Sequence, residues 1–147
     1  MVNIKDLLNI AVRIEAEGYS YYKKMERKST GKIKDLFSWL ADQEREHEKI
    51  FKNMIDDSEE NKETAYDEAL GYLDAYAAIS IIPKMKNDEI PVDFKEAIKA
   101  AMEVEKDSII FYTDLSDYVP GYKENFDKII EEERKHLKKL IALYENE

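Results

Sequence analysis

The stretch DLFSWLADQEREHEKIFKNM (residues 35–54) predicts an unbroken helix, because it contains neither glycine nor proline. Its apolar residues recur at every third or fourth position, as on one face of an amphipathic helix, at Phe37, Leu40, Phe51 and Met54. Between Leu40 and Phe51 the same stripe passes through Glu44 and His47. The sequence therefore places a carboxylate and an imidazole on a helix face that should be buried.

Composition restricts the class of protein. A chain of 147 residues fits one domain (1–147), and 38% charged with 44% hydrophobic residues is typical of a globular protein. Only four glycines and three prolines interrupt it, which favours long helices. Because cysteine is absent, disulfides, thiol catalysis, zinc–thiolate sites and iron–sulfur clusters are excluded. A net charge of −10 argues against nucleic-acid binding, which needs cationic side chains.

The N-terminal segment MVNIKDLLNIAVRIEAEG (1–18) carries charges through its apolar part and has no small-residue cleavage site. We therefore expect no signal peptide. No apolar run approaches the roughly 18 residues needed to cross a bilayer, so no membrane association is expected. The expected location is the cytoplasm.

Four long helical patterns follow one another, at about 3–28, 31–57, 93–118 and 121–145. Connections as short as 29–31 and 119–121 predict two antiparallel hairpins, at about 3–57 and 93–145. The expected fold is all-α: a four-helix bundle made of these two hairpins, joined by a long, partly helical crossover.

The crossover is expected at about 58–92. It contains one further helical pattern, ETAYDEALGYLDAYAAISII (63–82), which should end at Pro83. A linker of this length can run along the whole bundle. Asp93 with Glu96 has the spacing of a capping box and should open the second hairpin.

The two hairpins repeat each other in sequence. The apolar stripes of the first and third helices match at an offset of 90, and those of the second and fourth at 89. Each stripe has a glutamate at its central step, and two of them add a histidine one turn later. The resulting set is Glu15, Glu44 with His47, Glu105, and Glu133 with His136.

Four carboxylates buried at one level would be unstable on their own, because each buried charge costs several kcal/mol and the charges repel one another. Two divalent cations would neutralise them. Glutamate and histidine three residues apart project from one helix face and can reach the same ion. Oxygen and nitrogen ligands without thiolates suit iron or manganese, and zinc also fits. One Glu from each of two helices with Glu-x-x-His from the other two is a dinuclear ligand set in helical bundles.

Other interpretations of these residues stay open. The four glutamates could lie on the surface, or form a buried polar network without metal. Tyr22 and Tyr112 follow a stripe glutamate by seven residues and could be core residues or hydrogen-bond a metal carboxylate. The sequence does not identify the partner of the outer nitrogen of either histidine. The glutamates away from the stripes should be solvated: Glu17, Glu46, Glu103, Glu131 and Glu132.

Four segments resemble the ligand-bearing helices of the rubrerythrin branch of the ferritin-like superfamily: IEAEGYSYY (14–22), ADQEREHEKIF (41–51), VEKDSIIFYTDL (104–115) and EEERKHLKKL (131–140). The resemblance covers both hairpins and implies a ferritin-like bundle around two iron ions. It implies that Glu44 and Glu133 bridge the ions and that Tyr22 and Tyr112 lie just outside the ligands. The implied ligand set is Glu15, Glu44, His47, Glu105, Glu133 and His136.

The same resemblance implies an oxidoreductase active in oxidative stress, in which Fe2+/Fe3+ ions reduce hydrogen peroxide or dioxygen, and a homodimer. Two departures matter. Such proteins usually carry a further glutamate where this chain has Ser108, and a cysteine-rich domain that this chain lacks. The electron donor should then be separate, such as a rubredoxin-like protein. The alternatives are a ferroxidase or iron-handling protein, and a non-catalytic metal-binding helical module.

Overall fold

The computed structural model describes residues 2–58, 63–65, 67–86 and 93–146. Four long helices dominate it: α1 (Ile4–Arg27), α2 (Gly31–Asp57), α5 (Phe94–Ser116) and α6 (Lys123–Asn146). Each of their ends lies within two residues of the predicted position. The predicted all-α, ferritin-like bundle of two hairpins is therefore confirmed.

Side chains and glycines at the helix ends explain these boundaries. The side chain of Asn3 accepts a hydrogen bond from the Lys5 amide at 2.8 Å at the start of α1. Asp93 accepts one from the Lys95 amide at 3.0 Å, as expected of the residue predicted to open α5. Gly31 and Gly121 have φ values of 64° and 92°, which other residues rarely adopt, and they let the chain reverse inside each hairpin.

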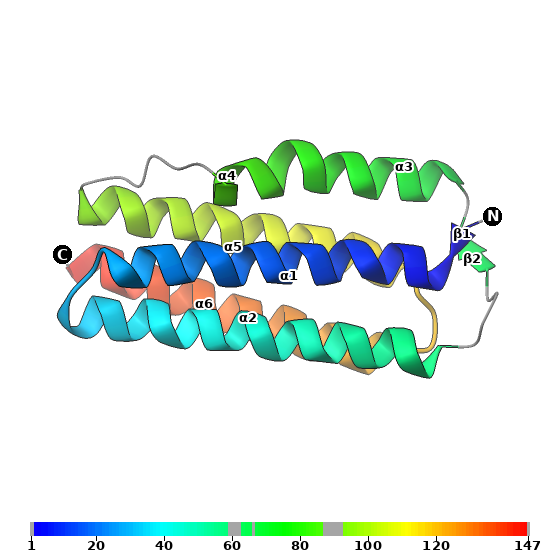
Figure 1. Cartoon of the computed structure of the whole chain (residues 1–147), viewed down its shortest axis with the longest axis horizontal. Helices are drawn as coiled ribbons and strands as arrows, with labels where there is room; N and C mark the ends of the chain where they lie inside the picture. The colour runs from blue at the N-terminus through cyan, green and yellow to red at the C-terminus, as the bar shows by residue number, and fades with distance from the viewer. Residues whose placement is uncertain (1, 59–62, 66, 87–92, 147) are drawn as a thin grey trace.

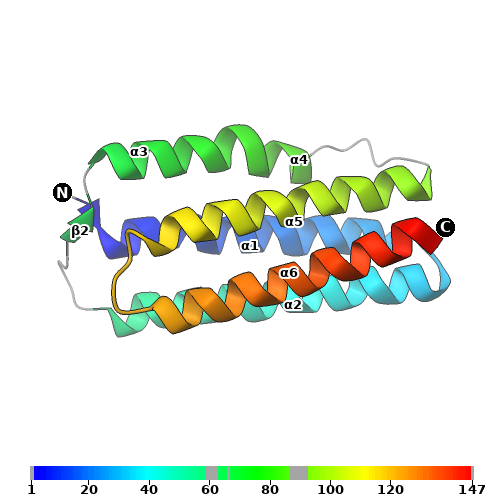
Figure 2. The ribbon, with the colours of Figure 1, turned by 180° about the vertical axis from the view of Figure 1, so that it is seen from behind.

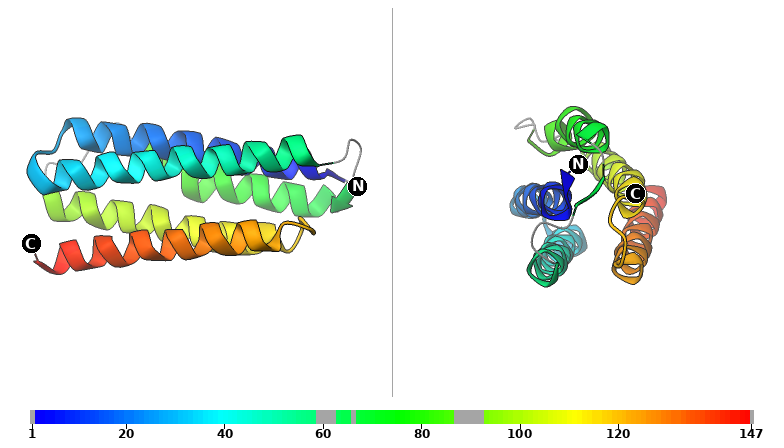
Figure 3. Two further views of the ribbon diagram at one scale, coloured as in Figure 1. Left: turned by 90° about the horizontal axis from the view of Figure 1, so that it is seen from below. Right: turned by 90° about the vertical axis from the view of Figure 1, so that its right-hand side faces the viewer.

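The two hairpins lie side by side along their full length. Helix α1 packs along α2, and α5 along α6, and the crossover lies over α1 and α5 (Figures 1 and 2). Seen from one end, α1 and α2 form one side of the bundle and α5 and α6 the other, with α3 above them (Figure 3). The crossover runs along the bundle, as its length predicted.

The crossover departs from its prediction at both ends. Its first part is a short strand, β2 (Glu63–Ala65), paired antiparallel with β1 (Val2–Asn3), so the helix starts only at α3 (Asp67–Tyr76). The helix then continues through a π-helical turn, η1 (Ala77–Ile81), into α4 (Ile82–Lys86). The remaining predicted crossover residues, 59–62, 66 and 87–92, lie outside the described part of the chain.

The predicted helix end at Pro83 is thus wrong. Proline has no amide hydrogen and its ring clashes with the carbonyl one turn earlier, which normally ends a helix. Here the turn before it is widened, and the Ile82 amide donates to the Ala77 carbonyl five residues back. Widened turns of this kind accommodate an irregularity inside a helix. The chain therefore passes Pro83 without leaving the helix.

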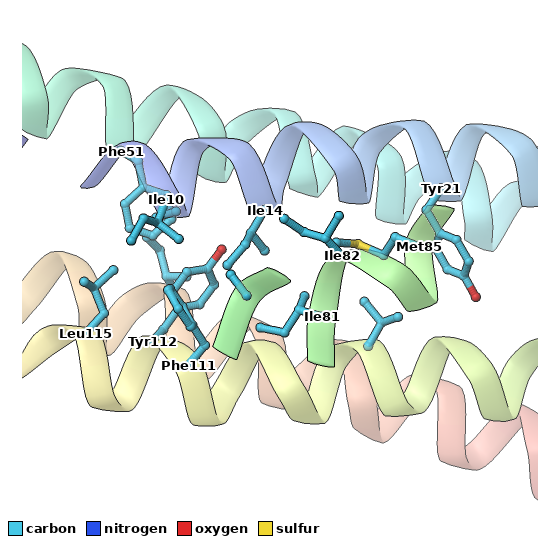
Figure 4. Packing of buried hydrophobic residues seen from close by; sticks show 14 of the residues in the cluster. Ile10, Ile14, Tyr21, Phe51, Ile81, Ile82, Met85, Phe111, Tyr112 and Leu115 are labelled. Atoms are coloured by element: carbon cyan, nitrogen blue, oxygen red, sulfur yellow. The ribbon is translucent and has the colours of Figure 1, made fainter. Parts of the chain in front are cut away.

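The apolar stripes face one another inside the bundle, as predicted. Stripe residues of the central turns are buried, whereas Ile33, Phe94, Tyr122 and Leu143 near the ends are only partly covered. Crossover residues Ile81, Ile82 and Met85 lie near Ile14 of α1 in the cluster of buried residues (Figure 4). None of the helices in the described ranges is long and apolar enough to span a membrane.

Candidate metal centre

The six polar stripe residues lie in the interior of the bundle. Their exposed fractions are 6% for Glu44 and 1% or less for Glu15, His47, Glu105, Glu133 and His136. Because all four helices contribute, the repeated layer expected from the sequence exists. The alternative in which the glutamates face solvent is wrong.

The donor atoms form two overlapping groups. In one, single donor atoms of Glu15, His47 and Glu133 lie within 4.8 Å of one another. The other combines Glu44, Glu105, Glu133 and His136 within the same limit. Glu133 belongs to both groups, which is the position that a bridging carboxylate must occupy. Glu44 belongs to one, and its predicted role as the other bridge remains a prediction.

Both histidines direct Nδ1 toward these carboxylates. His47 Nδ1 lies 2.9 Å from Glu133 Oε1 and 3.6 Å from Glu15 Oε1. His136 Nδ1 lies 3.7 Å from Glu105 Oε2 and 4.0 Å from Glu133 Oε1. The two rings are nearly parallel, with an angle of 14° between their planes and centroids 5.9 Å apart. They therefore approach the carboxylates as a matched pair, one from each hairpin.

Tyr22 and Tyr112 make the hydrogen bonds that the sequence suggested, each across to the opposite hairpin. The Tyr22 hydroxyl donates to Glu105 Oε1 at 2.5 Å, and the Tyr112 hydroxyl donates to Glu15 Oε1 at 2.6 Å. Both tyrosines are fully buried. On one side, the phenol of Tyr22 holds Glu105 Oε1 and leaves Oε2 facing His136 Nδ1. On the other, Tyr112 holds Glu15 Oε1, which is also the oxygen 3.6 Å from His47 Nδ1.

Several buried atoms at the centre make no hydrogen bond of good geometry, although His47 Nδ1 and Glu133 Oε1 lie 2.9 Å apart. They are Nδ1 of His47 and of His136, and one oxygen each of Glu15, Glu105 and Glu133. Buried polar atoms are rarely left in this state, because each costs about 1–3 kcal/mol. These five atoms are the oxygen and nitrogen donors that an iron or manganese ion prefers. The residues present thus fit a dinuclear metal centre.

The electrostatics lead to the same conclusion. Burial raises the pKa of Glu44 and of Glu133 well above the usual range, and neighbouring carboxylates raise it further. Burial alone would lower the pKa of His47, but Glu15 and Glu133 outweigh it and raise the value to about 12. Without cations, this centre therefore favours retained protons on Glu44, Glu133 and His47. Cations would take the place of those protons.

Glu132 is the residue that the sequence reasoning placed wrongly. It was expected in solvent, but its side chain is only 27% exposed and its Oε2 lies 2.6 Å from His47 Nε2. Helix α6 therefore contributes two adjacent glutamates, Glu133 toward the inner nitrogen of His47 and Glu132 toward the outer one. Chemistry predicts some carboxylate there, because a buried histidine that binds a metal usually donates its other N–H to one, but the sequence pattern does not show which.

Glu48 was also missed. It is only 6% exposed, and its Oε1 lies 2.7 Å from Arg45 Nη1. Trp39 and His136 form a T-shaped ring pair with centroids 5.0 Å apart. Of the other glutamates expected in solvent, Glu46 and Glu131 are exposed, Glu103 is half-buried, and Glu17 is partly covered beside Lys86.

Gly18 provides space for Glu44. A Cβ atom at this position of α1 would lie 2.7 Å from Glu44 Oε2, closer than atoms can approach. The glycine therefore lets the Glu44 carboxylate rest against the α1 backbone. Ser108, 90 residues later on α5, is buried at the equivalent place.

The comparisons with known proteins agree with this geometry. Residues 6–144 match the family model of rubrerythrin. The chain belongs to the rubrerythrin family. It is also similar to a crystal structure from Thermotoga maritima described as a ferritin-like diiron-carboxylate protein, with 30% identity and a TM-score of 0.70 over 98% of this chain and 95% of that one. A comparison with curated proteins gave no match.

Family membership and the buried glutamate–histidine cluster together identify a non-haem di-iron carboxylate protein. They indicate iron as the bound metal. The resemblance drawn from four short segments of sequence is thereby confirmed.

Proposed function

We propose that this protein is an oxidoreductase that reduces hydrogen peroxide, or dioxygen, at a dinuclear iron centre. The observation that carries the proposal is the convergence of five buried oxygen and nitrogen atoms from all four helices, none of which makes a hydrogen bond of good geometry. Such a set is costly unless cations occupy it, and the ligand types suit an ion that changes oxidation state.

The proposed ligands divide between the two groups of donor atoms. Glu15 and His47 would hold one ion, Glu105 and His136 the other, and Glu133 both. Glu44 would complete the set, either beside His136 or as a second bridge. When bound, two ferrous ions supply two electrons, which with two protons reduce hydrogen peroxide to two molecules of water.

The protein's own contribution is to position these ligands and to exclude water. Tyr22 and Tyr112 fix one oxygen each of Glu105 and Glu15, so that these carboxylates keep their orientation. Fully buried apolar side chains surround the centre along the bundle, among them Leu8, Phe37, Phe51, Ile98 and Phe126. A dry enclosure of this kind restricts side reactions of oxidising species.

We further propose that a separate protein, such as one resembling rubredoxin, returns the electrons, because this chain contains no cysteine for an iron–sulfur or rubredoxin-type site. A homodimer in the cytoplasm remains the expected state. Light scattering would distinguish this dimer from a hollow iron-storage shell of many chains, because the dimer has a mass of about 35 kDa, twice 17.3 kDa.

The proposal is tested with metal-free protein loaded with two Fe2+ per chain in the absence of oxygen. One equivalent of hydrogen peroxide should oxidise both ions, seen as ferric absorption in the near ultraviolet. Repeated additions of peroxide with a reductant should give turnover. If iron binds but stays ferrous, the redox function is wrong and the centre serves to complete the fold.

A matched pair of variants on α6 separates the centre from the surface. Glu133→Ala removes a carboxylate common to both groups of donors and should abolish iron oxidation. Glu131→Ala removes a carboxylate that is 52% exposed on the same helix, and should leave it intact. Equal loss in both variants would point to damage of α6 rather than of the centre.

A further inference from the structure

The two histidines differ at their outer nitrogens. His47 Nε2 lies 2.6 Å from Glu132 Oε2, a short contact typical of a nitrogen donating to a carboxylate. Within the ranges that the structure describes, His136 Nε2 has no such acceptor. The His136 ring instead packs against Trp39 in a T-shaped pair, with an angle of 77° between the ring planes.

The hairpin repeat identifies where this difference arises. The offset of 89 that relates α2 to α6 places Gln43 at the position equivalent to Glu132. Gln43, Glu132 and His136 line one surface depression of about 180 Å³. The residue of α2 that corresponds to Glu132 is therefore a neutral amide, and it lines the same depression as His136 without a hydrogen bond to that ring among the described residues.

A carboxylate on the outer nitrogen changes what the inner nitrogen can do. A carboxylate that accepts a hydrogen bond from Nε2–H fixes the tautomer in which Nδ1 carries the lone pair, and here Nδ1 faces Glu15 and Glu133. It also makes the imidazole a stronger donor, and loss of such a partner typically lowers metal affinity about 10–100-fold. His136 is without both effects.

From this difference we infer that the two metal positions are unequal. Glu132 is a positioning residue that makes the group Glu15–His47–Glu133 the stronger one, and Gln43 leaves the group around His136 the weaker one. The inference rests on the dinuclear centre proposed above. It adds an order of filling, which the ligand residues alone do not specify.

The test uses the fact that the chain contains only two histidines. Protein labelled with 15N-histidine is titrated with Zn2+, and the nitrogen signals of both rings are followed by NMR. The signals are assigned from the variants His47→Gln and His136→Gln. Below one equivalent of zinc, we expect Nδ1 of His47 to shift before Nδ1 of His136.

Two isosteric variants then test whether Glu132 and Gln43 cause the difference in affinity. Glu132→Gln keeps an oxygen that can accept from His47 Nε2 but removes the charge, and should lower the affinity of the first site about 10–100-fold and abolish the order. Gln43→Glu supplies a carboxylate on the His136 side and should raise the metal affinity of the second site toward that of the first. Unchanged circular dichroism would show that both variants fold.

The possible results are distinguishable. Simultaneous or reversed filling in the unaltered protein overturns the inference, and so does an order that Glu132→Gln leaves intact. If zinc shifts neither ring, the metal centre itself is wrong. Ordered filling by zinc combined with failure of the peroxide test would leave the asymmetry standing and remove only the redox function.

Discussion

The two hairpins are near copies at the centre and differ just around it. Both supply a glutamate from one helix and Glu-x-x-His from the next, and both send a tyrosine across to the other hairpin's glutamate. They differ at the adjacent positions, where Gly18 corresponds to Ser108 and Gln43 to Glu132. The repeat therefore sets which atoms converge, and the neighbouring residues decide how firmly each is held.

The largest effect, on metal content, should come from removing Glu133, the glutamate that the two donor groups share. Glu133 belongs to both donor groups and its hairpin counterpart Glu44 to one. Glu133→Ala should therefore lose both metal ions, while Glu44→Ala should retain about one per chain. Metal content after loading and desalting measures this. Equal losses would mean that both carboxylates bridge in the loaded protein, as the sequence resemblance implied.

The next effect concerns the protons that the metal-free centre retains. In the folded protein the pKa values of Glu44 and Glu133 are raised, mainly by burial, whereas in the unfolded chain such groups titrate near about 4.3. Above that pH, the folded protein therefore binds more protons than the unfolded chain. His47, with its pKa raised to about 12, adds to this proton uptake above about pH 6.5. Stability must fall as pH rises.

We expect the free energy of unfolding of the metal-free protein to drop between about pH 5 and 9, by about 1.4 kcal/mol per pH unit for each retained proton. Urea titrations at several pH values measure the slope. The variant Glu44→Gln, which has no proton to lose there, should flatten it. Metal-loaded protein should show the opposite trend, because binding displaces the protons. A flat profile in the metal-free protein would contradict this account.

The part of the metal centre that can be predicted from the sequence also follows from the repeat. The stripes alone placed Glu15, Glu44, Glu105 and Glu133 in one buried layer, because a helix has a fixed period and the hairpin loops are short. The contact between Glu132 and His47 could not be read in this way. It joins residues 85 positions apart and depends on how α2 and α6 are rotated about their axes.

The crossover was less predictable for a different reason. Its helix passes Pro83 because the Ala77–Ile81 turn is widened, and local propensity gives no sign of such a turn. Strand β2 forms only because β1 lies beside it, far away in the sequence. Both features arise from tertiary packing, whereas the hairpins follow from patterns within each helix.

A smaller effect tests whether the two tyrosines are equivalent. Tyr22→Phe and Tyr112→Phe each leave a buried carboxylate oxygen without its donor, which should cost about 1–3 kcal/mol in the metal-free protein. The symmetric geometry predicts similar losses, measured by urea unfolding. Tyr72→Phe serves as the control, because its hydroxyl donates to Asp114 on the exposed surface and should matter by less than about 0.5 kcal/mol. A large difference between the two buried variants would show that the asymmetry extends beyond the histidines.

The smallest effect on stability, but an informative one, comes from Gly18 and Ser108. Alanine at position 18 gains about 1 kcal/mol of helix propensity, yet its Cβ meets Glu44 Oε2 at 2.7 Å, and overpacking of this kind costs about 1–3 kcal/mol. The melting temperature of metal-free Gly18→Ala should therefore change little, while its metal affinity falls because Glu44 is displaced. Ser108→Ala removes only a hydroxyl and should bind metal normally. If Gly18→Ala also binds metal as tightly as the unaltered protein, Glu44 moves on loading, and the close approach to α1 belongs to the metal-free state alone.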